Sequence, residues 1–73
     1  MTYKIVWIET VERDRITADF MESYPQMKLT GYYYDDSVEL EVADYFIAKS
    51  KKEALKYAKE NYDCDVFSLF KVT

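Results

Sequence analysis

Apolar residues recur along this chain in short segments, and their spacing predicts where helices and strands form. The clearest helical pattern is Leu55, Ala58 and Tyr62, which follows the sequence Ser-Lys-Lys-Glu at 50–53. That tetrapeptide is a capping box, in which the serine oxygen accepts a hydrogen bond from the glutamate amide and the glutamate side chain reaches back. We therefore predict a helix over residues 50–62.

Strand-like segments, rich in β-branched and aromatic residues, flank this helix and begin the chain. One leads into the helix at 45–48, another leaves it at 66–72, and the N-terminal segment runs from 3 to 11. The two strands around the helix should run parallel, since strand–helix–strand units return the chain in the same direction. Segments 3–11 and 66–72 are apolar at both odd and even positions, which predicts central strands buried on two faces.

The middle of the chain predicts a β-hairpin. Residues 27–34 and 38–42 alternate between apolar and polar positions, and the spacer Asp35-Asp36-Ser37 is turn-forming. In the second arm the even positions are aliphatic and the odd ones are glutamates, so one face should be buried. We expect this arm to continue to Ala48, with a bulge or bend at Asp44.

Residues 13–24 fit two structures. Asp14 can cap a helix whose apolar face runs from Ile16 to Tyr24, and Pro25 would end that helix. The alternation that begins at Ile16 also suits a strand. We favour the helix, which makes the element order βαββαβ, the ferredoxin-like arrangement. With a strand the order becomes βββαβ.

Together these elements predict one α+β domain over residues 1–73, with a small antiparallel or mixed four-stranded sheet and one or two helices on one face. The helices would leave the second face of the sheet uncovered. An exposed apolar face of this kind usually marks an interaction surface. We expect Trp7, Tyr32 and Tyr34 to form an aromatic face that binds a protein partner or makes a homodimer, because interfaces favour these residue types.

Charge narrows the choice of partner. The net charge is −4, which argues against nucleic-acid binding by phosphate neutralisation and is compatible with a basic protein partner. The acids concentrate in the predicted hairpin, with no basic residue among them. We predict that this acidic cluster docks on a basic protein; it consists of Asp35, Asp36, Glu39, Glu41 and Asp44.

Several features that are common in active sites are missing from this sequence. There is no histidine, which removes the commonest general base and the commonest metal ligand. The single glycine, Gly31, is too few for a phosphate-binding loop. The single cysteine, Cys64, stands between two aspartates, which disfavour a reactive thiolate. We therefore expect no catalysis, no cofactor and no metal. The alternative is a carboxylate-based metal enzyme built on the acidic cluster.

A further alternative is a single-stranded RNA binder that stacks bases on the aromatic face. The aspartates that follow the tyrosines would repel phosphates, so we prefer a non-catalytic interaction protein. It would act by occlusion, as an inhibitor or adaptor of a basic, nucleic-acid-handling protein.

The short, acidic, tyrosine-rich and glycine-poor composition of the chain is common among proteins of phages and mobile elements. One unpaired cysteine, no signal peptide and no long apolar run predict a cytoplasmic protein without a membrane segment.

Overall fold

The structure, a computed structural model, describes residues 1–73. It contains a four-stranded antiparallel sheet and two α-helices, and it bears out the predicted α+β class. A short 3₁₀ turn, Arg13–Arg15, follows the first strand. In chain order the helices and strands are β1 (Thr2–Glu12), α1 (Ala18–Glu22), β2 (Gln26–Tyr32), β3 (Ser37–Ile47), α2 (Lys51–Asn61) and β4 (Phe67–Lys71).

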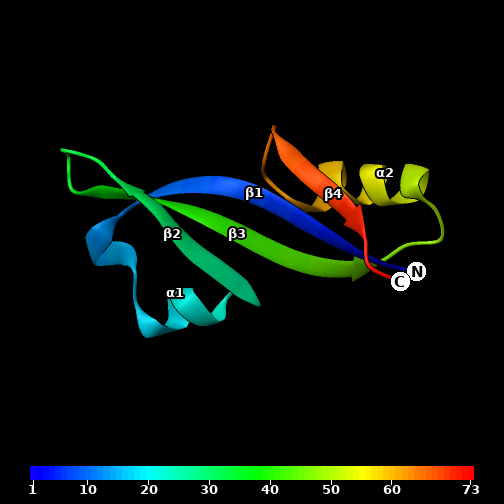
Figure 1. The fold of residues 1–73 in the computed structure, drawn as a ribbon, viewed down its shortest axis with the longest axis horizontal. Coiled ribbons are helices and arrows are strands. Elements are labelled where there is room, and N and C mark those ends of the chain that lie inside the picture. Colours follow the sequence, from blue (N-terminus) through cyan, green and yellow to red (C-terminus); the bar gives the residue numbers. More distant parts are fainter.

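The strands lie in the order β2-β3-β1-β4, and each neighbouring pair is antiparallel (Figure 1). The central strands β1 and β3 pair along the whole of β1, starting from Thr2 opposite Ile47. By contrast, β4 pairs with β1 only as far as Trp7. The long central pair makes the molecule elongated, 41 × 22 × 18 Å, with the β2–β3 turn at one end and both termini at the other.

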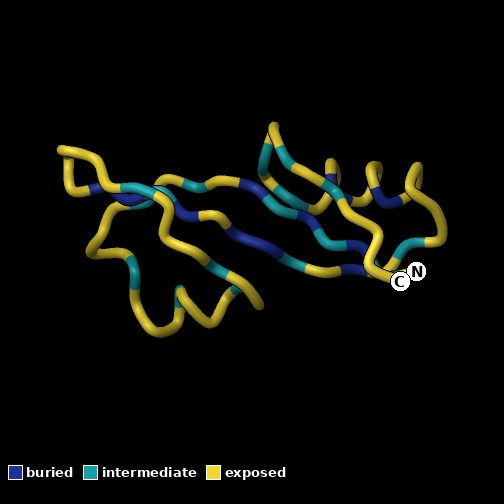
Figure 2. Tube along the Cα trace, in the orientation of Figure 1, coloured by how far each residue is buried: buried dark blue, intermediate teal, exposed yellow.

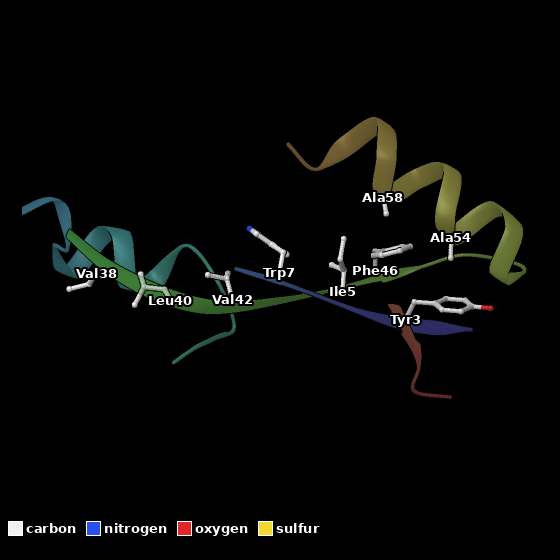
Figure 3. Close-up of a cluster of buried hydrophobic side chains, with 9 residues drawn as sticks. All are labelled: Tyr3, Ile5, Trp7, Val38, Leu40, Val42, Phe46, Ala54 and Ala58. Atoms are coloured by element: carbon white, nitrogen blue, oxygen red, sulfur yellow. The ribbon is translucent and has the colours of Figure 1, made fainter. Parts of the chain in front are cut away.

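The hydrophobic core lies on one face of the central strands, beneath both helices. Trp7 shows this directly, because its ring centroid lies 5.4 Å from that of Tyr24, just after α1, and 5.4 Å from that of Tyr62, just after α2. We call this side of the sheet the covered face and the other side the open face. Figure 2 shows that the buried positions follow β1 and β3. The core, drawn in Figure 3, consists of Tyr3, Ile5, Trp7, Val38, Leu40, Val42, Phe46, Ala54 and Ala58.

The helix predicted over residues 50–62 is confirmed as α2. Ser50 Oγ accepts a hydrogen bond from the Glu53 amide at 3.3 Å, which is the first bond of the predicted capping box. Ala54 and Ala58 are fully buried against the sheet, so their small side chains let the helix approach it closely. The strands on either side of α2, β3 and β4, run parallel as predicted, because each is antiparallel to β1 between them.

Residues 13–24 contain a helix, but a shorter one than the favoured prediction. Thr17 caps α1, its hydroxyl oxygen accepting from the Phe20 amide at 3.2 Å, whereas Asp14 lies in the preceding 3₁₀ turn. The predicted apolar residues Ile16, Phe20 and Tyr24 are half-buried and pack against the core. Neither α1 nor α2 combines the length and apolar character needed to cross a bilayer.

The predicted hairpin forms from β2 and β3, but its irregularity lies elsewhere than expected. β3 runs straight through Asp44, which pairs with Ile5 in an unbroken ladder to β1. The bulge is instead in β2, between Leu29 and Gly31. No bend is needed at Asp44, because its carboxylate has a partner on the covered face: the hydroxyl of Tyr62 donates to it at 2.8 Å. A charged residue can therefore remain in a regular strand there.

The prediction that residues 66–72 form a central strand is wrong. β4 is an edge strand whose only partner is β1. Phe67 and Leu69 lie half-buried on the covered face, whereas Phe70, on the open face, is 53% exposed. The chain leaves α2 on the outer side of β1, so nothing pairs with the far edge of β4. Its apolar residues at both parities consequently leave one side exposed.

Candidate interaction surfaces

The open face of the sheet carries apolar side chains that no helix covers. Successive side chains of β1 point to opposite faces. With the register of β1 against β3 and β4, this places two rows of side chains on the open face near the termini. In one row, Tyr45 and Phe70 lie on either side of Lys4. In the next, Ile47 pairs with Thr2, whose carbonyl also accepts from the Val72 amide. Ile47 is 80% exposed, and the open apolar patch consists of Tyr45, Ile47, Phe70 and Val72.

Trp7 does not belong to this face, which corrects the predicted aromatic face. It is 5% exposed, lies on the covered face and donates through Nε1 to the Glu9 carboxylate at 3.0 Å. β1 is apolar at both parities, so alternation alone does not say which side the helices cover. The useful signal was that the even series includes Lys4, whereas the odd series begins with three large apolar residues.

Tyr32 and Tyr34 are exposed but lie at the far end of the molecule, by the β2–β3 turn. The guanidinium of Arg13 stacks over the Tyr32 ring, 5.6 Å from its centroid. The neighbouring Tyr33 donates its hydroxyl to Glu39. Because that bond and the carboxylate charge favour the protonated phenol, the pKa of Tyr33 is raised. The structure therefore does not bring Trp7 together with the two exposed tyrosines.

The five acids of the predicted cluster separate into three places. Asp35 and Asp36 form the tip of the turn, where Ser37 donates its hydroxyl and its amide to the Asp35 carboxylate and lowers the pKa of Asp35. Glu39 is held by hydrogen bonds from two side chains of β2 and its connection, and these bonds lower the pKa of its carboxyl. Glu41 is exposed on the open face.

The fifth acid, Asp44, points to the covered face, where Tyr62 binds it. It therefore cannot contact a partner together with Glu39 and Glu41, which lie at the opposite parity of β3. Acids at the tip and on the open face remain available to a partner. No three carboxylate or thiol side chains lie close enough together to hold a metal ion.

A groove beside β1 was not among the surfaces predicted from the sequence. It lies between the middle of β1 and the connection from α2 to β4, and its volume is about 450 Å³. Cys64 lines it, and burial together with Asp63 and Asp65 raises the pKa of that thiol. The complete lining is Val6, Trp7, Ile8, Glu9, Glu41, Asp63, Cys64, Asp65, Val66, Phe67 and Ser68.

Comparison with known protein families, with curated proteins and with solved structures finds no match to this chain. Its function must therefore be inferred from the surfaces described above.

Proposed function

We propose that this chain is a small, non-catalytic interaction protein that forms a homodimer through the open apolar patch. The observation that carries the proposal is the uncovered side of the sheet, where Ile47 is 80% exposed and Phe70 is 53% exposed to solvent. Burial of such a patch is the main favourable term in protein association. Two sheets can pack face to face about 10 Å apart, which is the packing used in β-sandwiches.

The arrangement of the patch supports this mode of association. Tyr45 and Ile47 lie on β3, and Phe70 and Val72 lie on or next to β4, so the apolar side chains flank β1 on both sides. Lys4 lies between them and is half-buried. Its aliphatic stem can pack with the apolar side chains while its ammonium group reaches the rim.

The same layout supports the finer fold assignment. Each helix connects two strands that run parallel, with a third strand inserted between them: α1 joins β1 to β2 around β3, and α2 joins β3 to β4 around β1. Tyr24, just after α1, and Tyr62, just after α2, both pack against Trp7 on the covered face. These features support the ferredoxin-like arrangement, in which one face of the sheet is free for binding.

We further propose that the partner outside the dimer is a basic protein and that binding occludes its working surface. The acids at the tip, Asp35 and Asp36, lie at the opposite end of the long axis from the open patch. Association through the patch would leave them free. Charge-reversing substitutions at Asp35, Asp36, Glu39 and Glu41 should then abolish binding to that partner.

The test of the dimer is the molar mass in solution, measured by light scattering from micromolar to near-millimolar protein. We expect the native chain to have twice the monomer mass. Ile47→Lys and Phe70→Lys should give monomers, because each places a charge in the dimer contact. Met21→Lys is the matched control, since Met21 is exposed on α1 and away from the patch. A monomeric native chain throughout this range would contradict the dimer.

An RNA-binding function has weaker support. The residue expected to stack most strongly, Trp7, is enclosed by Tyr24 and Tyr62 and cannot meet a base. Only Tyr32 and Tyr34 remain, beside the acids of the turn.

A further inference from the structure

The backbone of β1 alternates in the direction of its hydrogen bonds. The carbonyl of Thr2 accepts from the Val72 amide at 2.8 Å, on the β4 side. The carbonyl of Met1 accepts from the Ala48 amide at 3.1 Å, on the β3 side. In an antiparallel ladder this alternation has a period of two residues. Even-numbered residues of β1 therefore direct their N–H and C=O groups toward β4, and odd-numbered residues toward β3.

This edge of β1 is unpaired beyond the start of β4. The β1–β4 ladder ends where Trp7 lies opposite Phe67, whereas β1 continues to Glu12. The backbone groups of Ile8, Thr10 and Glu12 consequently point toward the position where a neighbouring strand would lie. They form the free edge of β1, a ready template for another extended chain.

Space for such a chain exists beside the free edge. Figure 1 shows β1 continuing past the start of β4, and the groove of about 450 Å³ lies between the middle of β1 and the connection that enters β4. Ile8 and Glu9 line it from β1, and Val66 lines it from the connection before β4. Val66 is 85% exposed, so an apolar contact is available on that wall. A strand paired to β1 would lie about 4.8 Å away from it.

The charges around the groove select the chemistry of the added chain. Four acids line it, namely Glu9, Glu41, Asp63 and Asp65, and no lysine or arginine does. The one ion pair within 4 Å in the structure joins Arg15 to Glu12, outside the groove lining. A second copy of this edge would bring acids against acids. A segment that carries lysine or arginine would be attracted to them.

We propose that the free edge of β1 adds an extended, lysine- or arginine-containing segment of a partner protein as an extra strand. The backbone groups of Ile8 and Thr10 provide hydrogen bonds that do not depend on the sequence of the segment. The groove acids select its basic side chains. This division between backbone pairing and side-chain selection is typical of β-strand addition. The inference deepens the proposed basic partner but uses a surface separate from the open patch, so the two can fail independently.

The test uses a blocked peptide of alternating lysine and valine, with a glutamate–valine peptide as its charge-reversed control. Binding to the full chain is followed at low salt by the NMR shifts and hydrogen exchange of the backbone amides. We expect the lysine peptide to slow exchange of the Ile8 and Thr10 amides, and the glutamate peptide to leave them unchanged. Raising the salt should weaken binding, because exposed charges are screened.

A matched pair of variants separates backbone pairing from charge attraction. Thr10→Pro removes an N–H that points into solvent in the free protein, and such a position on a strand edge tolerates proline. Thr10→Val keeps the N–H. We expect Thr10→Pro to weaken lysine-peptide binding about tenfold, the effect of losing one hydrogen bond, and Thr10→Val to leave it unchanged. Asp63→Asn with Asp65→Asn should weaken binding and flatten its salt dependence.

Several results would overturn the proposal. Binding of equal strength by Thr10→Pro, or shifts confined to the Asp35–Asp36 tip, would show attraction without strand addition. No binding at millimolar lysine peptide would mean that the acids only keep strand edges apart. A dimer of the native chain that Thr10→Pro dissociates would assign the edge to a second copy. If Thr10→Pro does not fold, protection of the Ile8 and Thr10 amides in the native chain decides the question.

Discussion

Tyr62 holds its hydroxyl proton more tightly than a free tyrosine does. Burial disfavours the phenolate, and the hydroxyl donates to the carboxylate of Asp44, so the pKa of Tyr62 is raised well above its ordinary value. Burial also raises the pKa of Tyr24, which lies on the other side of Trp7. The two aromatic residues that enclose the tryptophan are therefore both stabilised in their neutral form.

This raised pKa predicts a loss of stability in alkali. A group whose pKa is higher in the folded state contributes stability that is complete below its unfolded pKa, about 10 here, and that disappears as the pH rises further. For one proton the loss is at most about 1.4 kcal/mol per pH unit. We expect Tyr62→Phe to be about 1–2 kcal/mol less stable at pH 7, because it removes a hydrogen bond to a charged group.

The measurement is urea unfolding followed by Trp7 fluorescence between pH 7 and 11. Tyr62→Phe should have a shallower alkaline slope than the native chain. Tyr34→Phe is the control, since Tyr34 is fully exposed and should change neither the slope nor the stability at pH 7. An unchanged slope in Tyr62→Phe would mean that another group, such as Tyr24, governs the alkaline transition.

Among the elements, the β2–β3 turn contains the one non-glycine residue with a positive φ, Asp36 at 62°. It follows Tyr34 and Asp35 in the turn, and the Tyr33 amide donates to the Ser37 carbonyl at 2.9 Å across it. Hairpins with three-residue loops favour glycine at this left-handed position. Aspartate tolerates the conformation better than most residues but is still strained relative to glycine.

We expect Asp36→Gly to raise the free energy of unfolding by about 0.5–1 kcal/mol. Asp35→Gly, one residue earlier, should lower it, because the Asp35 carboxylate accepts both hydrogen bonds from Ser37. Urea denaturation of the two variants and the native chain gives both signs. If Asp36→Gly is destabilising, the side chain of Asp36 has a role that its backbone conformation does not explain.

Patterns among neighbouring residues predicted the helices and strands well. The order of the strands in the sheet was harder to predict. The serine cap of α2 and the aspartate-rich turn each depend on a few consecutive residues, so both elements could be predicted. In contrast, β4 has apolar residues at both odd and even positions, and this pattern does not distinguish a central strand from an edge strand. Its place in the sheet depends on where α2 returns the chain, which no local pattern encodes. For the same reason the unpaired edge of β1 was not predicted, since it arises from the unequal reach of two strands.

For the whole molecule, stability depends on a narrow core. It follows two strands, and α1 and α2 contribute few buried residues to it; α1 contributes none that is fully buried. Ile5 lies at its centre and is fully buried, whereas Ile47 on the same sheet is largely exposed. A chain of this length buries only about 60% of its unfolded surface, so small losses in this core matter.

The matched pair Ile5→Val and Ile47→Val measures this dependence. Each change removes one methylene, but only the first leaves a gap in packed surroundings. We expect Ile5→Val to cost about 0.5–1.5 kcal/mol of stability. Ile47→Val should change stability by less than about 0.5 kcal/mol. Thermal unfolding at protein concentrations below the dissociation constant of the proposed dimer gives both values. An equal loss for the two variants would mean that Ile47 is buried in solution by some other contact.

The central place of the first strand also governs how the chain reaches its fold. β1 is made first, yet its partners β3 and β4 come much later, and the last pairing joins Thr2 to Val72. Joining segments so distant in sequence costs loop entropy before any contact forms, so folding should take on the order of milliseconds or longer rather than microseconds. During that time the apolar side chains of Ile5-Val6-Trp7-Ile8 remain exposed on both sides of the strand. The most vulnerable moment for this protein is therefore the interval before its last strand closes the sheet.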